Sequence, residues 1–251
     1  MKQEIALHGT RLVRVLSELL REDVRYPPPN LAQQLASLVT FQESEQLSSL
    51  FIKQQRLELD SAESTALNIK EEVLNTRLAL VETIATSFVQ GSGSRIRLPL
   101  VNPNTSISAL LEFAPYHRFY AAHQRNFELK IHTLQGLLRD AIGGQSPALA
   151  ELVALDKGLR NALMNHIRTL LAGIPRLLKQ RFDSLLQQHQ ECRIGIEESN
   201  EAMWNSWARK GAGLDMFLQD MQGLLLAELE LRLLPLLGLV EAVDEQTGID
   251  P

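Results

Sequence analysis

Apolar residues recur along most of the chain at the three- and four-residue spacing of amphipathic α-helices. Leucines repeat in this way over residues 149–170 and 214–240, and a mixed apolar pattern with the same period covers residues 44–90. This spacing gathers apolar side chains on one face of a helix, and that face has to be buried against other helices. The pattern therefore predicts an all-α fold, a multi-helix bundle of about six to nine helices joined by short loops.

Glycine and proline residues set the expected ends of these helices. The prolines at 27–29 end the first helix, and Pro115 suits the first turn of a later one. Gly91 and Gly143 are typical of residues that terminate a helix. We expect helices over residues 10–22, 30–39, 44–90 with a break or bend near residue 60, 106–113, 115–142, 146–190 with a kink or break at Pro175, and from 214 through Pro235.

One segment carries two periods at once. The sequence AELELRLL at residues 227–234 alternates polar and apolar residues, which is a strand signal. The same residues also belong to a helical stripe that includes Leu229 and Leu233 and extends back to Leu218. Because the chain offers no second strand for pairing, the helix is the better interpretation.

A glycine- and proline-rich stretch, GSGSRIRLPLVNPNTS at residues 91–106, is the clearest linker in the chain. It predicts two helical subdomains, residues 1–90 and 107–251, on either side of this linker. Its glycines with Arg95 and Arg97 could also hold a phosphate, but the stretch follows a helix rather than a strand and has no Lys-Ser/Thr pair. A flexible linker is therefore the preferred interpretation.

Charge is distributed unevenly along the chain. The formal net charge is −5, but residues 95–193 carry 13 basic and 7 acidic side chains, whereas residues 194–251 carry 3 basic and 11 acidic ones. Two such segments attract each other within a fold or face different partners. Internal compensation is the simpler expectation, and the overall negative charge argues against nucleic-acid binding.

Several features bear on the compartment. Cys192 is the only cysteine, so no disulfide can form within one chain, as is usual in a reducing compartment. The N-terminal segment lacks the apolar core of a signal peptide. The most apolar stretch, residues 224–240, contains Glu228, Arg232 and Pro235, which makes it a poor membrane span and a good buried helix. We expect a cytoplasmic protein without direct membrane insertion.

Sequence motifs for catalysis and cofactor binding are absent. The chain has no G-x-x-x-x-G-K-[ST], G-x-G-x-x-G or G-x-S-x-G motif, and no H-E-x-x-H. It also lacks the E-x-x-H pairs with which helical bundles hold two iron ions. The sequence therefore favours a protein without an enzymatic role, and it predicts no cofactor and no metal.

Residues 116–132 form the densest group of aromatic and polar side chains. On a helix, Tyr116, Tyr120, His123 and Phe127 share one face. This face is either a binding surface or, as is commoner for aromatic stripes, part of the core. The same two alternatives hold for the tryptophans near residue 205, and His166 lies within an apolar stripe as a core or edge residue. The candidate partner-binding residues are Tyr116, Tyr120, His123, Arg125, Trp204 and Trp207.

Four stretches resemble one proteobacterial family of about this length that is classed as a domain of unknown function. They are TRLVRVLSELLREDV, FAPYHRFYAAHQRNFELKI, SPALAELVALDKGLRNALMNHIRTLLAGIPRLLKQRF and FLQDMQGLLLAELELRLLPLLGLVEAV, and together they cover most of the chain. YPPPN, at residues 26–30, departs from the family pattern. The family's genes are often found beside those for a coiled-coil membrane protein and an OmpA/MotB-like protein, so the resemblance implies a cytoplasmic accessory to an envelope-spanning assembly.

Three functions follow as expectations. The first is a non-enzymatic helical adaptor or subunit, whose partners are other proteins of one assembly, with a homo-oligomer as a further option. The second is a nucleic-acid-associated protein that uses the basic centre. The third is an unrecognised enzyme or metal site formed by His117, His123, Glu128 and His132. The basic centre comprises Arg118, Arg125, Arg160, Arg168, Arg176, Lys179 and Arg181.

Overall fold

The computed structural model describes residues 11–12, 15–16, 62–99, 108, 111–143, 171–192 and 199–247. Within these residues there are five helices and no strand, which confirms the all-α prediction. The expected helices at 30–39 and 44–61, most of those at 10–22 and 106–113, and the run from 146 to 170 lie outside them, so the predicted total of six to nine stays a prediction. The five helices are α4 (Ala62–Ser87), α6 (Ala114–Gly143), α8 (Ile174–Glu191), α9 (Asn200–Trp207) and α10 (Gly213–Thr247).

The helix ends follow the local signals in the sequence. Pro115 lies in the first turn of α6, and Pro175 lies in the first turn of α8 after the N-cap residue Gly173. At Pro175 the chain therefore breaks and starts a new helix, because proline fits a first turn, where no backbone N–H is needed. Ser199 caps α9 by accepting a hydrogen bond from the Ala202 N–H. Beyond α4, Gly91 has a positive φ of 74°, which favours glycine.

α10 is the longest helix and contains the stretch with two periods. Residues 227–234 are helical, as the helical interpretation predicted, and Pro235 is accommodated inside the helix. α10 packs against α4, α6 and α8. A helix surrounded in this way has to be apolar on most of its circumference, which explains why its leucines occur on several faces. Among the described residues, no helix combines the length and apolar character needed to cross a membrane.

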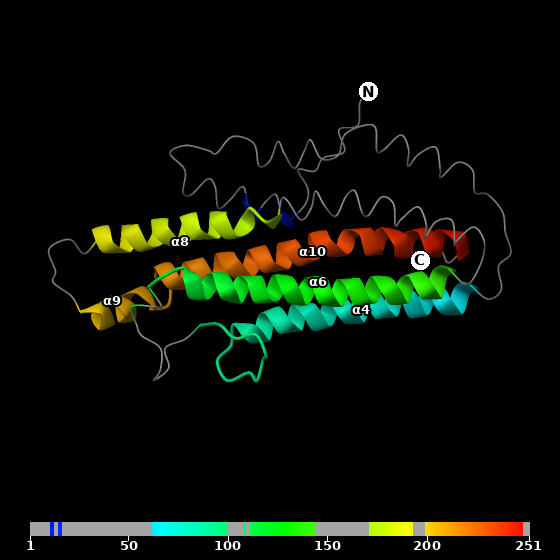
Figure 1. Ribbon diagram of the computed structural model, residues 1–251, viewed down its shortest axis with the longest axis horizontal. Helices are drawn as coiled ribbons and strands as arrows, with labels where there is room; N and C mark the ends of the chain where they lie inside the picture. Colours follow the sequence, from blue (N-terminus) through cyan, green and yellow to red (C-terminus); the bar gives the residue numbers. More distant parts are fainter. Residues whose placement is uncertain are drawn as a thin grey trace, which may run out of the picture.

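The helices α4, α6, α10 and α8 lie side by side along the long axis of the molecule (Figure 1). α4 contacts both α6 and α10, and α6 contacts α10, so these three share one core, while α8 packs mainly on α10. α4 and α6 run antiparallel, and α10 runs parallel to α6 (Figure 1). α4 precedes the 91–106 linker and α6 follows it, so the core spans that boundary; the division into subdomains stays a prediction.

Candidate functional site

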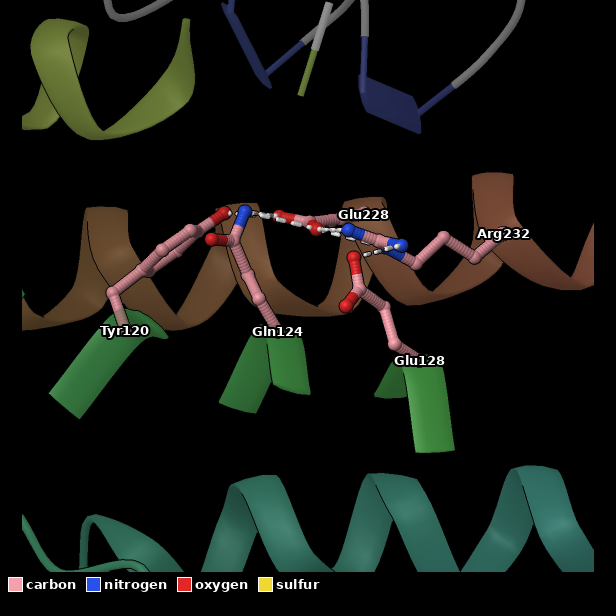
Figure 2. A network of polar contacts seen from close by, with 5 residues as sticks. All are labelled: Tyr120, Gln124, Glu128, Glu228 and Arg232. Atoms are coloured by element: carbon pink, nitrogen blue, oxygen red, sulfur yellow. Dashed lines mark hydrogen bonds and ion pairs between the residues drawn. The ribbon is translucent and has the colours of Figure 1, made fainter. Parts of the chain in front are cut away.

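A polar network inside the bundle joins α6 to α10 (Figure 2). Tyr120, Gln124 and Glu128 follow one another at four-residue steps along α6, so their side chains project from one side of that helix. Glu228 and Arg232 are also four residues apart, on α10. Because α6 and α10 run in the same direction, the two series meet step by step along the interface.

The carboxylate of Glu228 is the centre of this network. The Tyr120 hydroxyl donates to Oε2 at 2.7 Å, and the Gln124 Nε2 amide lies 3.1 Å from both carboxylate oxygens. Arg232 Nε donates to Oε1 at 2.8 Å, and a second guanidinium nitrogen lies 2.7 Å from the same oxygen. Glu228 is 0% exposed, so these donors replace the water that a carboxylate otherwise requires.

Arg232 extends the network from the interior towards the protein surface. Its side chain is 5% exposed, and its Nη1 lies 3.6 Å from Oε1 of Glu128, whose side chain is 44% exposed. One guanidinium thus pairs with a fully buried carboxylate and with a second one at the surface. A buried charge with matched partners is tolerated, whereas removal of one partner leaves the other charge uncompensated in the interior.

The network also acts on the phenol of Tyr120. Burial raises the pKa of Tyr120 well above its ordinary value, the negative charge of Glu228 and the hydrogen bond to it raise it further, and Arg232 opposes these effects. The hydroxyl therefore stays protonated and donates to the carboxylate at any physiological pH. Here the phenol serves as a fixed hydrogen-bond donor and not as a general base.

These contacts indicate a structural role for the network. The donors and acceptors face one another, and Tyr120 and Glu228 are both 0% exposed, so neither can touch a substrate in this conformation. Among the described residues, no three His, Cys, Asp or Glu side chains lie close enough to hold a metal ion. The network stabilises one register of α6 against α10, because sliding either helix by a turn separates the charges.

A second buried polar pair joins α4 to α6. His123 Nε2 lies 2.9 Å from Ser87 Oγ, and that hydroxyl donates to the backbone oxygen of Ile84 at 2.7 Å. Since the hydroxyl proton is used there, the geometry assigns the Nε2–H tautomer, in which the ring donates to Ser87. Nδ1 then carries a buried lone pair without a hydrogen-bond partner. Burial lowers the pKa of His123 to about 4, so the ring is neutral at pH 7.

A cluster of aromatic rings closes the end of the bundle where α8, α9 and α10 meet. Phe182 of α8 packs against Phe217 of α10 and Trp207 of α9, with ring centroids 5.1 and 5.9 Å apart. Trp207 is 0% exposed, and its ring lies so close to Gly213 that a Cβ there would overlap it. His189 of α8 lies beside the same ring, so this tryptophan joins all three helices.

The six candidate partner-binding residues separate into two groups. Tyr116, Tyr120, His123 and Trp207 are 0% exposed and Trp204 is 9% exposed. Their side chains therefore pack inside the bundle, which is the core alternative that helical aromatic stripes favour. Arg125 has an exposed side chain on α6. His166 lies outside the described residues.

The four residues of the suggested metal site do not come together. His117 and His132 are exposed, whereas His123 is buried against α4 and Glu128 points to Arg232. This position of Glu128 follows from α10 lying along that side of α6. The helix 116–132 thus divides its polar residues between the core, the α10 contact and the solvent.

The basic centre is also divided. Arg181 is buried and its Nε lies 2.8 Å from Oδ2 of Asp220, a residue of the acidic C-terminal segment. Lys179 pairs with Asp183. Arg118, Arg125 and Arg176 are exposed, and Arg160 and Arg168 lie outside the described residues. Part of the charge asymmetry is thus compensated within the bundle.

Sequence reasoning identified Tyr120 and His123 as candidates but missed their partners in both polar sites. Glu228 and Arg232 were recognised only as reasons against a membrane span, and Ser87 was not considered. A signal was present for the first pair: opposite charges four residues apart in an otherwise apolar helix are expected to pair. Their partners on α6 were not identifiable, because no local pattern specifies which helices lie side by side.

Comparison with known proteins gives one match. A family model described as a protein of unknown function (DUF3348) matches residues 1–245. No curated protein and no solved structure matches the chain.

Proposed function

Because the chain belongs to the DUF3348 family of unknown function, we propose a function from the structure: a non-enzymatic helical adaptor that binds other proteins of a larger assembly. The observation that carries this proposal is a set of exposed leucines on α4 and α6. Leu74 is 50% exposed, Leu78 66%, Leu129 65% and Leu137 56%. Leu74 and Leu78 are four residues apart and share one side of α4, and exposed apolar side chains that lie together are typical of protein-binding surfaces.

The interior polar groups support an adaptor rather than an enzyme. Glu228, Tyr120 and Arg232 use their donors and acceptors on one another, and His123 donates to Ser87 inside the α4–α6 contact. These are side chains that catalysis commonly uses, and here their contacts hold helices together. An adaptor needs a rigid bundle, and these interior contacts support that requirement.

The proposal also says which assembly the adaptor joins. The residues that resemble a family encoded near a coiled-coil membrane protein and an OmpA/MotB-like protein suggest partners at the cell envelope. In that case the chain is an accessory on the cytoplasmic side, which contacts the assembly through its surface and not through a membrane helix of its own.

A comparative pull-down tests the adaptor proposal. The full chain, tagged and expressed at its native level, is cross-linked and recovered from its own organism beside the variant Leu74→Ser/Leu137→Ser. We expect the wild-type chain to recover specific proteins that the variant recovers at least about tenfold less, as loss of an interface anchor predicts. Recovery of the wild-type chain alone, or of the same proteins by both baits, would contradict the proposal.

A further inference from the structure

The contact between Ser87 and His123 also connects α6 to the linker that follows α4. Ser87 is the last residue of α4. Its hydroxyl lies 2.9 Å from His123 Nε2, and its backbone oxygen accepts a 3.1 Å hydrogen bond from the Leu98 N–H. Ser87 therefore contacts α6 through its side chain and the linker through its backbone.

The linker folds back on the end of α4. The Ser92 hydroxyl donates to the backbone oxygen of Thr86 at 2.6 Å. Leu98 is buried, and Ile96 packs against the core. We call residues 87–98, the end of α4 with the linker folded on it, the latch. Because the linker is bonded to the last turn of α4, the whole latch should move as one unit.

The imidazole of His123 lies in a site that suits only its neutral form. Phe119 and Phe127 flank it on α6, with ring centroids 4.9 and 6.0 Å away. Its Nε2–H donates to Ser87, and Nδ1 is buried without a hydrogen-bond partner. A second proton would create an N–H donor at Nδ1 that meets no acceptor in the described part of the chain, and burial of an unpaired donor is unfavourable. The closed contact therefore opposes protonation of the ring.

The charged groups on the surrounding elements do not offset this cost. On α6 the phenol of Tyr120 stays protonated, and on α10 Glu228 is already paired with Arg232. Burial is the cause of the lowered pKa of His123. The other charged groups nearest to the contact in sequence, on α6, α4 and the linker, are exposed: Arg125, Glu82, Arg95 and Arg97.

The end of α4 is the side of this contact that can yield. His123 lies inside α6, with helix before and after it, whereas Ser87 ends α4 and is followed by Gly91 at positive φ. Helix ends and loops open at a lower free energy than helix interiors. Beyond the hydrogen bond to His123, the latch meets α6 through Phe88, whose ring centroid is 5.2 Å from that of Phe119.

We propose that the latch is an acid-released switch: neutral His123 holds it on α6, and protonation of the ring releases it. Release frees the linker and uncovers the side of α6 that carries Phe119 and His123. The helices α6, α8 and α10 stay packed, because the Glu228 network and the aromatic cluster around Trp207 do not include the latch. This inference does not depend on the adaptor function, since no partner takes part in it.

Linkage between protonation and release sets the size of the effect. The pKa of His123 is about 4 in the closed contact and returns to its ordinary value of about 6.5 when the ring meets water. The released state therefore binds the proton more tightly, and acid favours release. Between pH 7 and pH 5 the equilibrium constant for release should rise by about 20-fold.

Amide hydrogen exchange of the full chain at pH 7 and pH 5, corrected for the intrinsic effect of pH on exchange, tests the switch. We expect the latch amides, the Leu98 N–H among them, to open about 20-fold more often at pH 5. Their opening should hardly respond to low concentrations of urea, because local release exposes little surface. The amides of α8 should open far less often and should respond to urea, since they require global unfolding.

Three variants identify the group that titrates. His123→Gln keeps an amide donor for Ser87 but has no titrating ring, so the opening of its latch should change by less than about threefold between the two pH values. His117→Gln alters an exposed histidine of the same helix and should keep the wild-type response. Ser87→Ala removes the acceptor, so its latch should open roughly tenfold more often already at pH 7. Circular dichroism checks that each variant is folded.

The outcomes decide between a local switch and its alternatives. A response present in the wild type and His117→Gln and absent in His123→Gln supports the proposal. Latch amides without a pH response, or with the same response in His123→Gln, would overturn the role of His123. Latch amides that open only together with those of α8, with the same urea dependence, would show that acid unfolds the whole bundle and would overturn the local switch.

Discussion

The Tyr120 hydroxyl on α6 donates a 2.7 Å hydrogen bond to the carboxylate of Glu228 on α10, 108 positions later in the chain. Both residues are fully buried, and Arg232 neutralises the carboxylate from one turn further along α10. The hydrogen bond thus serves a charged carboxylate in the interior of the bundle. The stability of the bundle should therefore depend on each member of this network.

Glu228→Gln should lower the free energy of unfolding by about 3–5 kcal/mol, the usual effect of breaking a buried ion pair. The change keeps the shape of the side chain but leaves Arg232 without its buried counter-charge. Urea unfolding followed by circular dichroism measures the difference.

Glu230→Gln is the matched control for this change. Glu230 is two residues away and pairs with Arg11 at the surface, where the two side chains are 36% and 48% exposed. Loss of an exposed pair should cost less than about 1 kcal/mol. Equal effects of the two changes would show that Glu228 is not an internal charge centre.

Tyr120→Phe should lower the free energy of unfolding by about 1–3 kcal/mol, because Glu228 loses a donor that no water can replace. It should also weaken the alkaline sensitivity of the fold. The raised pKa of Tyr120 means that the folded chain binds the phenol proton more tightly than the unfolded chain does. The contribution of this proton to the free energy of unfolding is therefore complete below the ordinary tyrosine pKa of about 10, and it is lost as pH rises above that value. Urea unfolding at pH 8 and above, with both proteins, tests this; identical pH profiles would contradict it.

His123 should make the fold sensitive to acid. Its pKa is about 4 in the folded chain, against about 6.5 when unfolded. The unfolded state thus binds the proton more readily between these values. The free energy of unfolding should be highest above pH 6.5 and fall by roughly 3 kcal/mol as pH drops through this window.

A pair of histidine variants isolates this effect. His123→Gln removes the buried imidazole and should flatten the profile between pH 7 and pH 4.5 relative to the wild type. His117→Gln changes an exposed residue of the same helix and should leave the wild-type slope in place. The attribution to His123 fails if both variants keep that slope.

Gly213→Ala should destabilise the fold by about 2 kcal/mol or more, since the added methyl group overlaps the buried Trp207 ring. Gly238→Ala, later in the same helix, meets no atom within 4 Å and should stabilise by up to about 1 kcal/mol through helix propensity. Thermal unfolding of both variants checks the opposite signs. Tryptophan fluorescence reports whether the Trp207 site is disturbed.

Much of the local structure was predictable from the sequence. The helical period, the prolines in the first turns of α6 and α8, and the glycines after α4 all act over a few residues. The helical form of residues 227–234 was also predictable, since a strand there would have had no partner. The core position of the aromatic stripe on α6 followed from its helical spacing.

The candidate sites were less predictable. Glu228 and Glu230 are both acidic residues of one apolar helix, yet one is completely buried and the other lies at the surface. His123 was a candidate residue, but its partner Ser87 is 36 positions away on another helix. Neither distinction can be made without knowing which helices are neighbours.

By itself, the sequence indicated that the chain forms helices, where several of them start and stop, and which residues share a face, because these depend on backbone geometry within a few residues. It did not indicate α9. Only the tertiary structure decided that Glu228 lies inside and that Leu78 and Leu129 lie outside. Burial of a face depends on which helices pack against it and at what height. Contacts such as Tyr120–Glu228 and Ser87–His123 bring together distant segments, and the free energy of that packing selects one register among many.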